Sequence, residues 1–269
     1  MKNNFLFIIF IIILNYFLYQ HAMGADQFNF DITEVEITEN GNKFKGRKRG
    51  IITTEDGVLI TADKFEYDKL SNILNANGNV KIDDKKRNYL IQAEEITYFR
   101  NEEKIFTGGK KRGVITTEED VLIIADKFEY FRSLNIITGI GDVKIDDKIK
   151  DFKIDARKIT YLKNEEKIFT DGETKAIIES KYNFESKDVL LLRNEQKLVS
   201  NNKSTIKDDE LNLYKLDNFI FHMSEKLLKG KNINIITNYS KPKSDKFFFK
   251  DGFFNFKNKN FVAKNTKIF

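Results

Sequence analysis

The sequence contains a 63-residue block that occurs twice in succession, over residues 47–109 and 110–172. Ala62–Tyr67, for example, returns as Ala125–Tyr130, and the other matching segments have the same offset, so no gap separates the copies. A closed globular fold rarely accepts so long an insertion in its middle. A stack of equivalent units accepts it readily, because each unit contacts only its neighbours. The duplication therefore predicts an elongated repeat protein.

Each block contains two copies of a shorter unit, in which a small residue, two polar residues and an apolar-x-apolar triplet follow one another. The clear copies begin at Ala62, Ala93, Ala125 and Ala156, at nearly equal intervals of half a block. The pattern becomes weaker after residue 186. Two units per block mean that the duplication adds an even number of equivalent elements.

The hydrophobic pattern of these units is that of short strands. Apolar and polar residues alternate over Val58–Ala62 and again over Phe65–Tyr67, which indicates β-structure. The spacing of three between Ala62 and Phe65 predicts a bulge or corner at Asp63-Lys64, where the strand passes from one sheet to the other. Turn residues separate the strands, and no helical period of useful length follows residue 25. We therefore expect an all-β protein of 14–16 antiparallel strands, stacked as two opposed sheets.

The N-terminus predicts export. Lys2 precedes an apolar run over residues 5–19, and small residues follow up to Ala25, as in a secretory signal peptide over residues 1–25. The alternative is an uncleaved anchor, although the run is shorter than the roughly 20 residues needed to span a bilayer. In either case residues 26–269 lie outside the cytoplasm, in a cell envelope.

Charge is distributed unevenly along the chain. The formal net charge is +5, but residues 201–269 contain 14 basic and 7 acidic residues, so that this section carries +7 and the first 200 residues carry −2. The same section is rich in phenylalanine. We expect it to form diverged strands whose lysines protect sheet edges. The alternative is an aromatic and basic edge that meets lipid phosphates or a protein partner.

Residues for common enzyme chemistry are missing from the sequence. There is no cysteine, and the two histidines are His21 and His222, which cannot form a usual zinc site. Neither a phosphate-binding glycine loop nor a nucleophile elbow is present. The recurring pairs Asp83-Asp84, Asp146-Asp147 and Asp208-Asp209 are interpreted as turn residues, because two carboxylates fall short of the ligands that Ca²⁺ requires. The sequence predicts a protein that is not an enzyme and needs no cofactor.

The phrase over Ala62–Ile82, and its copy over Ala125–Ile145, resembles the OstA-like β-jellyroll of lipopolysaccharide transport proteins. This family includes the periplasmic bridge protein and the N-terminal domain of the outer-membrane lipopolysaccharide-assembly protein. The resemblance covers roughly residues 45–200 and fades afterwards. It implies an elongated, open jellyroll that carries lipid A acyl chains between its sheets. It also implies edge-to-edge strand pairing with other jellyroll proteins of the bridge, and contact with an outer-membrane barrel and its lipoprotein partner.

The recurring apolar positions are the residues expected to line such a groove. An acyl chain of about 12–14 carbons gains roughly 10 kcal/mol on leaving water, at ~0.8 kcal/mol per methylene, and repeated similar positions would hold it evenly along its path. The competing interpretation is that these side chains fill a closed core. The positions are Ile60, Phe65, Tyr67, Val80, Ile82, Ile96, Tyr98, Ile123, Phe128, Tyr130, Val143, Ile145, Ile159 and Tyr161.

The sequence thus favours a non-enzymatic module for lipopolysaccharide transport and outer-membrane assembly. Its length of about eight units favours the N-terminal periplasmic portion of the outer-membrane assembly protein, on the periplasmic face of that membrane. The alternatives are a free periplasmic bridge protein, a surface-exposed structural or adhesive β-repeat protein, and an inner-membrane bridge component that keeps residues 5–19 as its anchor.

Overall fold

The computed structural model describes residues 28–117 and 120–268. The expected fold class is confirmed, because these residues form antiparallel strands and three single 3-10 turns. The expected signal peptide, residues 1–25, lies outside the described residues. Among the described residues, no helix has the length and apolar character needed to cross a membrane.

The strands follow one another with short connections along the whole chain. The 3-10 turns are η1 (Glu39–Gly41), η2 (Arg100–Glu102) and η3 (Lys163–Glu165). The strands are β1 (Asn29–Ile32), β2 (Val35–Thr38), β3 (Lys43–Gly46), β4 (Gly50–Thr53), β5 (Leu59–Ala62), β6 (Lys64–Asp68), β7 (Ile73–Asp84), β8 (Tyr89–Phe99), β9 (Lys104–Gly108), β10 (Gly113–Thr117), β11 (Val121–Ala125), β12 (Lys127–Phe131), β13 (Ile136–Asp147), β14 (Phe152–Leu162), β15 (Lys167–Ile178), β16 (Tyr182–Lys187), β17 (Leu190–Leu192), β18 (Lys197–Ser200), β19 (Ser204–Lys207), β20 (Leu213–Leu216), β21 (Asn218–His222), β22 (Leu227–Ile236), β23 (Lys246–Asn255), β24 (Asn260–Lys264) and β25 (Lys267–Ile268).

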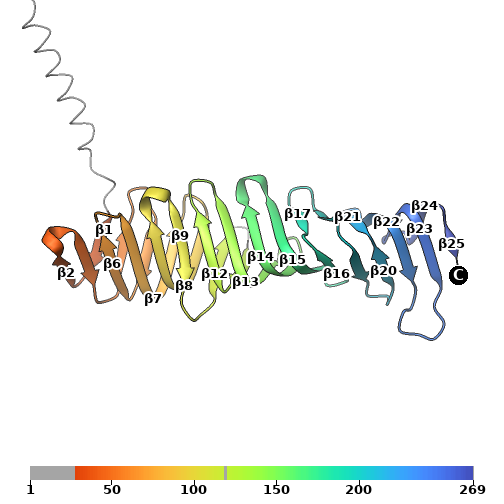
Figure 1. Ribbon diagram of the computed structural model, residues 1–269, viewed down its shortest axis with the longest axis horizontal. Coiled ribbons are helices and arrows are strands. Elements are labelled where there is room, and N and C mark those ends of the chain that lie inside the picture. Colours follow the sequence, from red (N-terminus) through yellow and green to blue (C-terminus); the bar gives the residue numbers. More distant parts are fainter. Residues whose placement is uncertain (1–27, 118–119, 269) are drawn as a thin grey trace, which may run out of the picture.

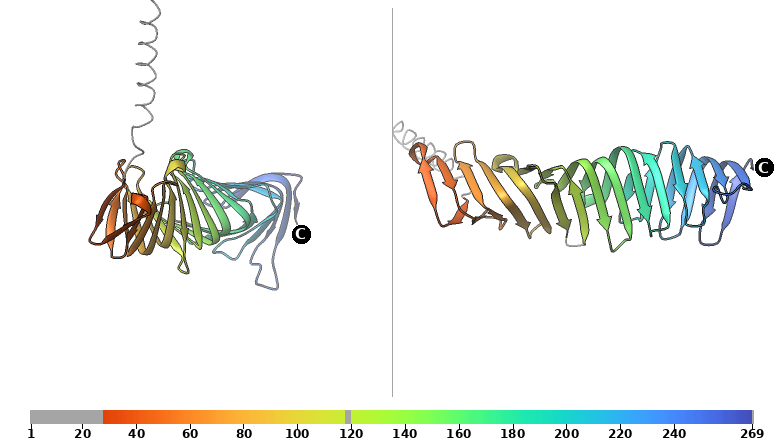
Figure 2. Two further views of the ribbon diagram at one scale, coloured as in Figure 1. Left: turned by 60° about the vertical axis from the view of Figure 1, so that its left-hand side comes forward. Right: turned by 90° about the horizontal axis from the view of Figure 1, so that it is seen from below.

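The strands form one continuous meander that is folded along its length. The chain crosses the full width of the sheet, turns, and crosses back beside its previous path, so that each crossing pairs with the one before and the one after. A long crossing is one strand, such as β7 or β8, whereas others are divided in the middle, such as β5 and β6. The crossings succeed one another along the long axis of the molecule (Figures 1 and 2).

The predicted number of strands agrees with the number of crossings. The described residues form 25 strands, but nine crossings are divided into two strands each, which leaves 16 crossings. Each 63-residue block spans four crossings, and the elements β5 to β9 recur as β11 to β15. The duplication therefore adds an even number of crossings and preserves the direction of the strands that follow.

The sheet bends along a crease in the middle of the crossings, and the predicted corner lies on it. Ala62 ends β5 and Phe65 follows in β6, and both side chains are buried although three positions separate them. In the adjacent strand, Gly78 and Asn79 have φ values of +81° and +48°, and the register shifts between Asn77 and Val80. A Cβ on Gly78 would lie 2.7 Å from Asp63 Oδ2. This bulge therefore requires glycine.

The crease divides the sheet into two arms. The first arm ends in the loops 69–72, 100–103, 132–135, 163–166, 193–196, 223–226 and 256–259, and the second arm ends in loops that include 54–58, 85–88, 148–151 and 208–212. Most of these loops have four residues. The fourth residue of such a loop has a positive φ, in the left-handed conformation, which Asn and Asp adopt readily. Alternate residues of both arms point into one continuous hydrophobic core, which extends from Phe28 to Phe256.

Candidate functional site: the interior and its seam

The fourteen predicted lining residues all point into the interior between the two arms. The most exposed of them, Tyr67, is 6% exposed, and Ile60, Tyr98 and Tyr161 are fully buried. They come together in one hydrophobic cluster, where they pack against each other from opposite arms. In this structure the side chains themselves occupy the interior. The complete set is Ile60, Phe65, Tyr67, Val80, Ile82, Ile96, Tyr98, Ile123, Phe128, Tyr130, Val143, Ile145, Ile159 and Tyr161.

The loop ends of the two arms meet along a line opposite the crease, which we call the seam. Near its middle, Arg132 of the first arm is fully buried. Its Nε donates to Asp84 Oδ2 over 3.0 Å and its Nη2 to Asp56 Oδ2 over 2.6 Å, and both acceptors belong to the second arm. Its Nη1 donates to the Tyr98 hydroxyl over 2.6 Å and also binds Glu103. We call this group the first clasp, because it joins the two arms.

A second clasp repeats this arrangement one block further along. Arg193, 1% exposed, donates from Nη2 to Asp147 Oδ2 over 2.8 Å and from Nη1 to the Tyr161 hydroxyl over 2.8 Å, and it also binds Glu166. In addition, Lys150 Nζ donates to the Arg193 carbonyl. Asp147, Tyr161 and Glu166 are the second-block copies of Asp84, Tyr98 and Glu103. Arg193 lies two positions before the residue that matches Arg132 at the offset of 63.

These contacts add to one interpretation of the sequence. Asp84 and Asp147 are turn residues as expected, since their Oδ1 atoms accept from the backbone N–H groups of Arg87 and Lys150. Both are also fully buried at the ends of strands β7 and β13, which the sequence did not predict. Both lie in the inward-facing row of their strand. A buried carboxylate requires a partner of opposite charge, and the arginine from the opposite arm supplies it.

Burial and ion pairing shift the ionisation of the clasp residues. Burial raises the pKa of the Tyr98 hydroxyl to about 12, although Arg132 and Arg100 oppose the shift. Burial also disfavours the charged form of Asp56, but hydrogen bonds from Thr54 and Arg132 outweigh it and hold the pKa of that carboxyl below its ordinary value. At neutral pH Asp56 is therefore ionised, Arg132 is charged and Tyr98 is neutral.

A backbone contact identifies the equivalent position on every first-arm loop. The N–H of the first loop residue donates to the carbonyl of the last residue of the preceding loop, at 2.8–3.2 Å. The first five of these positions carry a basic residue and the last two an apolar one. In chain order they are Lys69, Arg100, Arg132, Lys163, Arg193, Met223 and Phe256.

The sequence contains a signal for the arginine of the first clasp, but not for Arg193, which follows Leu191. Each buried tyrosine that ends an apolar-x-apolar triplet is followed two positions later by a basic residue, as in Tyr98-x-Arg100, Tyr130-x-Arg132 and Tyr161-x-Lys163. Because side chains alternate along a strand, residues two apart point to the same face. Arg100 and Arg132 continue the inward row in this way, whereas Lys69, two positions after Tyr67, is exposed.

Near the C-terminal end the seam encloses a cavity of about 240 Å³. Aromatic rings from both arms form its walls, and the loop Asp208–Asn212 forms its acidic rim. Its lining consists of Tyr182, Asp208, Asp209, Glu210, Asn212, Tyr214, Ile235, Thr237, Phe247, Phe254, Phe256, Lys259 and Phe261.

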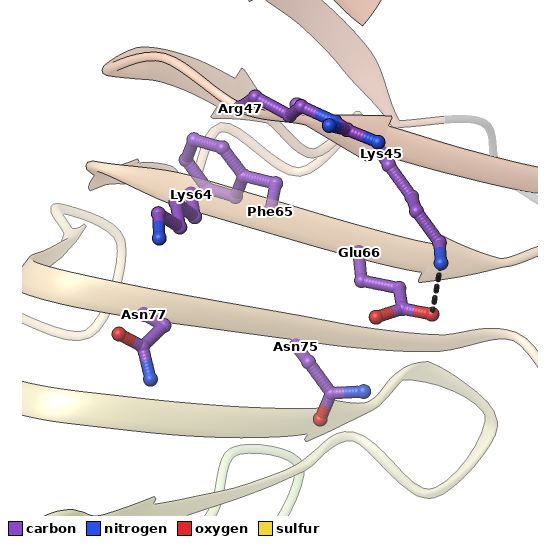
Figure 3. Close-up of a pocket in the computed structure, with 8 residues that line it drawn as sticks. Lys45, Arg47, Lys64, Phe65, Glu66, Asn75 and Asn77 are labelled. Atoms are coloured by element: carbon purple, nitrogen blue, oxygen red, sulfur yellow. Dashed lines mark ion pairs between the residues drawn. The ribbon is translucent and has the colours of Figure 1, made fainter. Parts of the chain in front are cut away.

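A larger hollow of about 670 Å³ lies on β3, β6 and β7, and Phe65 and Gly46 contribute to its lining (Figure 3). Lys45 Nζ lies 3.7 Å from Glu66 Oε1 there, and Arg47, Lys64, Asn75 and Asn77 complete the polar lining. This hollow spans three strands, whereas the apolar cluster of the interior extends from Phe28 to Phe256. The interior is therefore the stronger candidate for a functional site. In the described part of the chain, no three His, Cys, Asp or Glu residues are grouped so that they could hold a metal ion.

Comparison with known proteins gives matches to solved structures. No protein-family model matches the sequence, and no curated protein matches it either. Among solved structures, the chain is similar to LptH of Pseudomonas aeruginosa, described as the LptA-homologous periplasmic component of the lipopolysaccharide transport device; the two are 16% identical, the match covers 44% of this chain and 83% of LptH, and the TM-score is 0.39. It is also similar to the TCP10 domain of Danio rerio CPAP, with 9% identity, coverage of 81% and 97%, and a TM-score of 0.18.

Proposed function

We propose that this protein is a non-enzymatic module of the cell envelope that carries the acyl chains of lipopolysaccharide between its two arms. The observation that carries the proposal is the inner face, where one cluster of buried apolar side chains extends from Phe28 to Phe256 along the length of the described residues. Similar apolar positions recur at each crossing, so neighbouring sites along the path would bind an acyl chain with similar affinity. The resemblance of Ala62–Ile82 to the OstA-like jellyroll and the expected signal peptide agree with this role.

Loading the interior requires the two arms to move apart, because their side chains fill the space between them. The clasps at Arg132 and Arg193, both buried, oppose this movement. Opening either clasp exposes its charged groups to solvent or leaves a buried charge without its partner. Acyl chains would then replace the contacts that the inward residues of one arm make with those of the other. The edge strands, β1 and β2 at one end and β24 and β25 at the other, are the surfaces at which other jellyroll proteins would pair.

Photo-crosslinking in living cells tests the proposal. A photoreactive phenylalanine analogue at Phe65 or Phe128, both on the inner face, should form an adduct with lipopolysaccharide. The matched controls carry the analogue at Glu66 or Glu129, the next residues along the same strands, whose side chains are not in the core. Adducts at the control positions alone, or at none of several inner positions, would refute transport through the interior.

Within this function, we assign the chain to the N-terminal periplasmic portion of the outer-membrane assembly protein, on account of its 16 crossings. Sequencing the N-terminus of the mature protein from membranes distinguishes a cleaved signal from a retained anchor. Detection of the same sequence in a longer, barrel-containing polypeptide would support the assignment, and recovery of a free periplasmic protein of this size would support the bridge protein instead.

A further inference from the structure

The C-terminal cavity occupies the place of a third clasp. Ile82, Ile145 and Ile206 are each buried, and each is followed two residues later by an aspartate at the second-arm end of the crossing. The first two of these aspartates, Asp84 and Asp147, receive an arginine from the opposite arm. The third is Asp208, which lines the cavity.

The residue opposite Asp208 is a phenylalanine. The N–H of Phe256 donates to the Lys226 carbonyl over 2.9 Å, as the N–H of Arg132 and that of Arg193 donate to the preceding loops, also over 2.9 Å. Phe256 thus has the backbone position of the two clasp arginines. The C-terminal section keeps the carboxylate of the clasp but not its cation.

Neutral groups hold Asp208 in place. Its Oδ1 accepts from the backbone N–H groups of Glu210 and Asn212 over 3.0 and 2.8 Å, and its Oδ2 accepts from Asn212 Nδ2 and the Tyr214 hydroxyl, both over 2.9 Å. Among the described residues, no basic side chain forms an ion pair with Asp208 or with the exposed Asp209 beside it. The nearby Lys259 binds Glu210 over 2.6 Å, in a pair that is more than half exposed.

The aromatic walls favour a cation as well. The Phe256 ring centroid lies 4.8 Å from that of Tyr182 and 5.1 Å from that of Tyr214, and Phe254 lies 4.8 Å from Phe256. The faces of aromatic rings attract guanidinium and ammonium groups, particularly where water is displaced. The same walls present an apolar surface to the rest of a ligand.

We propose that this cavity binds a small cationic amphiphile, namely an alkyl or aryl body with a guanidinium or ammonium group. The cation occupies the place of the missing arginine between Asp208 and the aromatic rings, and the apolar body packs against Phe254 and Phe256. The net charge of the lining is negative, because it contains three carboxylates and one lysine, and a negative charge favours a cationic ligand. The site is independent of lipopolysaccharide transport and does not require it.

Binding of matched amphiphiles to the full chain tests this site. Dodecylguanidinium, dodecyl sulfate and dodecyl maltoside are titrated below their micellar concentrations, with binding followed by calorimetry. Dodecylguanidinium is expected to bind at least tenfold more tightly than either of the others. The net charge of +5 favours the sulfate at non-specific sites, so equal or tighter binding of the sulfate would overturn the proposal.

Three variants locate the binding. Phe256→Arg supplies the missing cation and should reduce dodecylguanidinium binding at least tenfold while raising the melting temperature. Asp208→Asn combined with Asp209→Asn should also reduce binding tenfold, and this variant decides the matter if Phe256→Arg does not fold. Asp171→Asn, an exposed carboxylate on β15, is the control and should bind as the parent does. Unchanged binding in the first two variants would contradict the site, irrespective of whether lipopolysaccharide adducts form in the interior.

Discussion

The middle of the molecule and its C-terminal section close the same seam by different means. In the middle, Arg132 and Arg193 bridge the arms through buried ion pairs. At the C-terminal end, Phe256 and its aromatic neighbours pack against each other and leave a cavity beside Asp208. A buried ion pair contributes little net stability compared with apolar packing, but it is costly to break and therefore specifies one alignment. We infer that the clasps fix the alignment of the two arms, whereas the C-terminal end, which has no clasp arginine, can admit a ligand.

The largest expected effect comes from removing a clasp arginine. Arg132→Ala removes the closer of the two arginines that pair with the buried Asp84 and leaves Arg87 at 3.4 Å, so it should lower the free energy of unfolding by about 3 kcal/mol. Urea denaturation of the purified protein measures the change. The control is Lys215→Ala, at an exposed lysine on β20. A surface substitution of this kind should change the free energy of unfolding by less than about 0.5 kcal/mol. A loss for Arg132→Ala no larger than that of the control would mean that the clasp does not hold the arms together.

Deleting residues 110–172 should produce a shorter protein that still folds, because it removes four crossings and one of the two clasps. In the full chain Arg193 binds Asp147, Tyr161 and Glu166. In the shortened chain it should bind their first-block copies Asp84, Tyr98 and Glu103 and so take the place of Arg132.

Circular dichroism and thermal unfolding measure the outcome of this deletion. Within the shortened chain, Arg193→Ala should then cost about 3 kcal/mol, as a clasp arginine does in the full chain. An unfolded deletion variant, or one that is indifferent to Arg193→Ala, would contradict the equivalence of the two blocks.

Alkaline pH should weaken the clasped region next. The Tyr98 hydroxyl has a pKa of about 12 in the folded protein, against about 10 in an unfolded chain. Its contribution of about 2–3 kcal/mol is therefore fully present below about pH 10 and is lost as the pH rises through about 12. Unfolding midpoints in urea between about pH 9 and pH 12 measure the loss. The Tyr98→Phe variant should show a smaller decrease over this range, and an identical decrease would assign the effect to other residues.

Acid should have the smallest effect on the first clasp. Because the pKa of Asp56 is lower in the folded protein, its contribution is present above its unfolded pKa of about 3.9 and is lost as the pH falls toward the folded value. The side chain is partly exposed, so solvent screening limits the contribution to about 1 kcal/mol. Comparing Asp56→Asn with the parent at pH 6 and pH 3 checks this. The difference between them should shrink at pH 3, and a constant difference would exclude ionisation as its cause.

The sequence predicted the elements of this fold better than the contacts between its two arms. Alternation and spacing were sufficient to predict the corner at Asp63 and the inward direction of residues such as Phe65 and Tyr98, because these depend on neighbours within one strand. The pair Arg132 and Asp84, 48 residues apart, depends on how the whole sheet folds at the crease. Asp84 was assigned to a turn because its neighbours in sequence are turn residues, while its partner lies across the seam.

The meander gives the protein a particular response to force. The backbone of each crossing pairs only with the crossings that precede and follow it in the chain. A force applied to the two termini would therefore unfold the crossings one after another from an end, and the molecule would not unfold in a single step. The clasps link crossings that are not adjacent in sequence, so resistance should rise where Arg132 or Arg193 must leave its carboxylates. The block carries the acidic and tyrosine members of a clasp, and the residues that follow it supply the arginine. Its duplication therefore lengthens the protein and adds one further point of mechanical resistance.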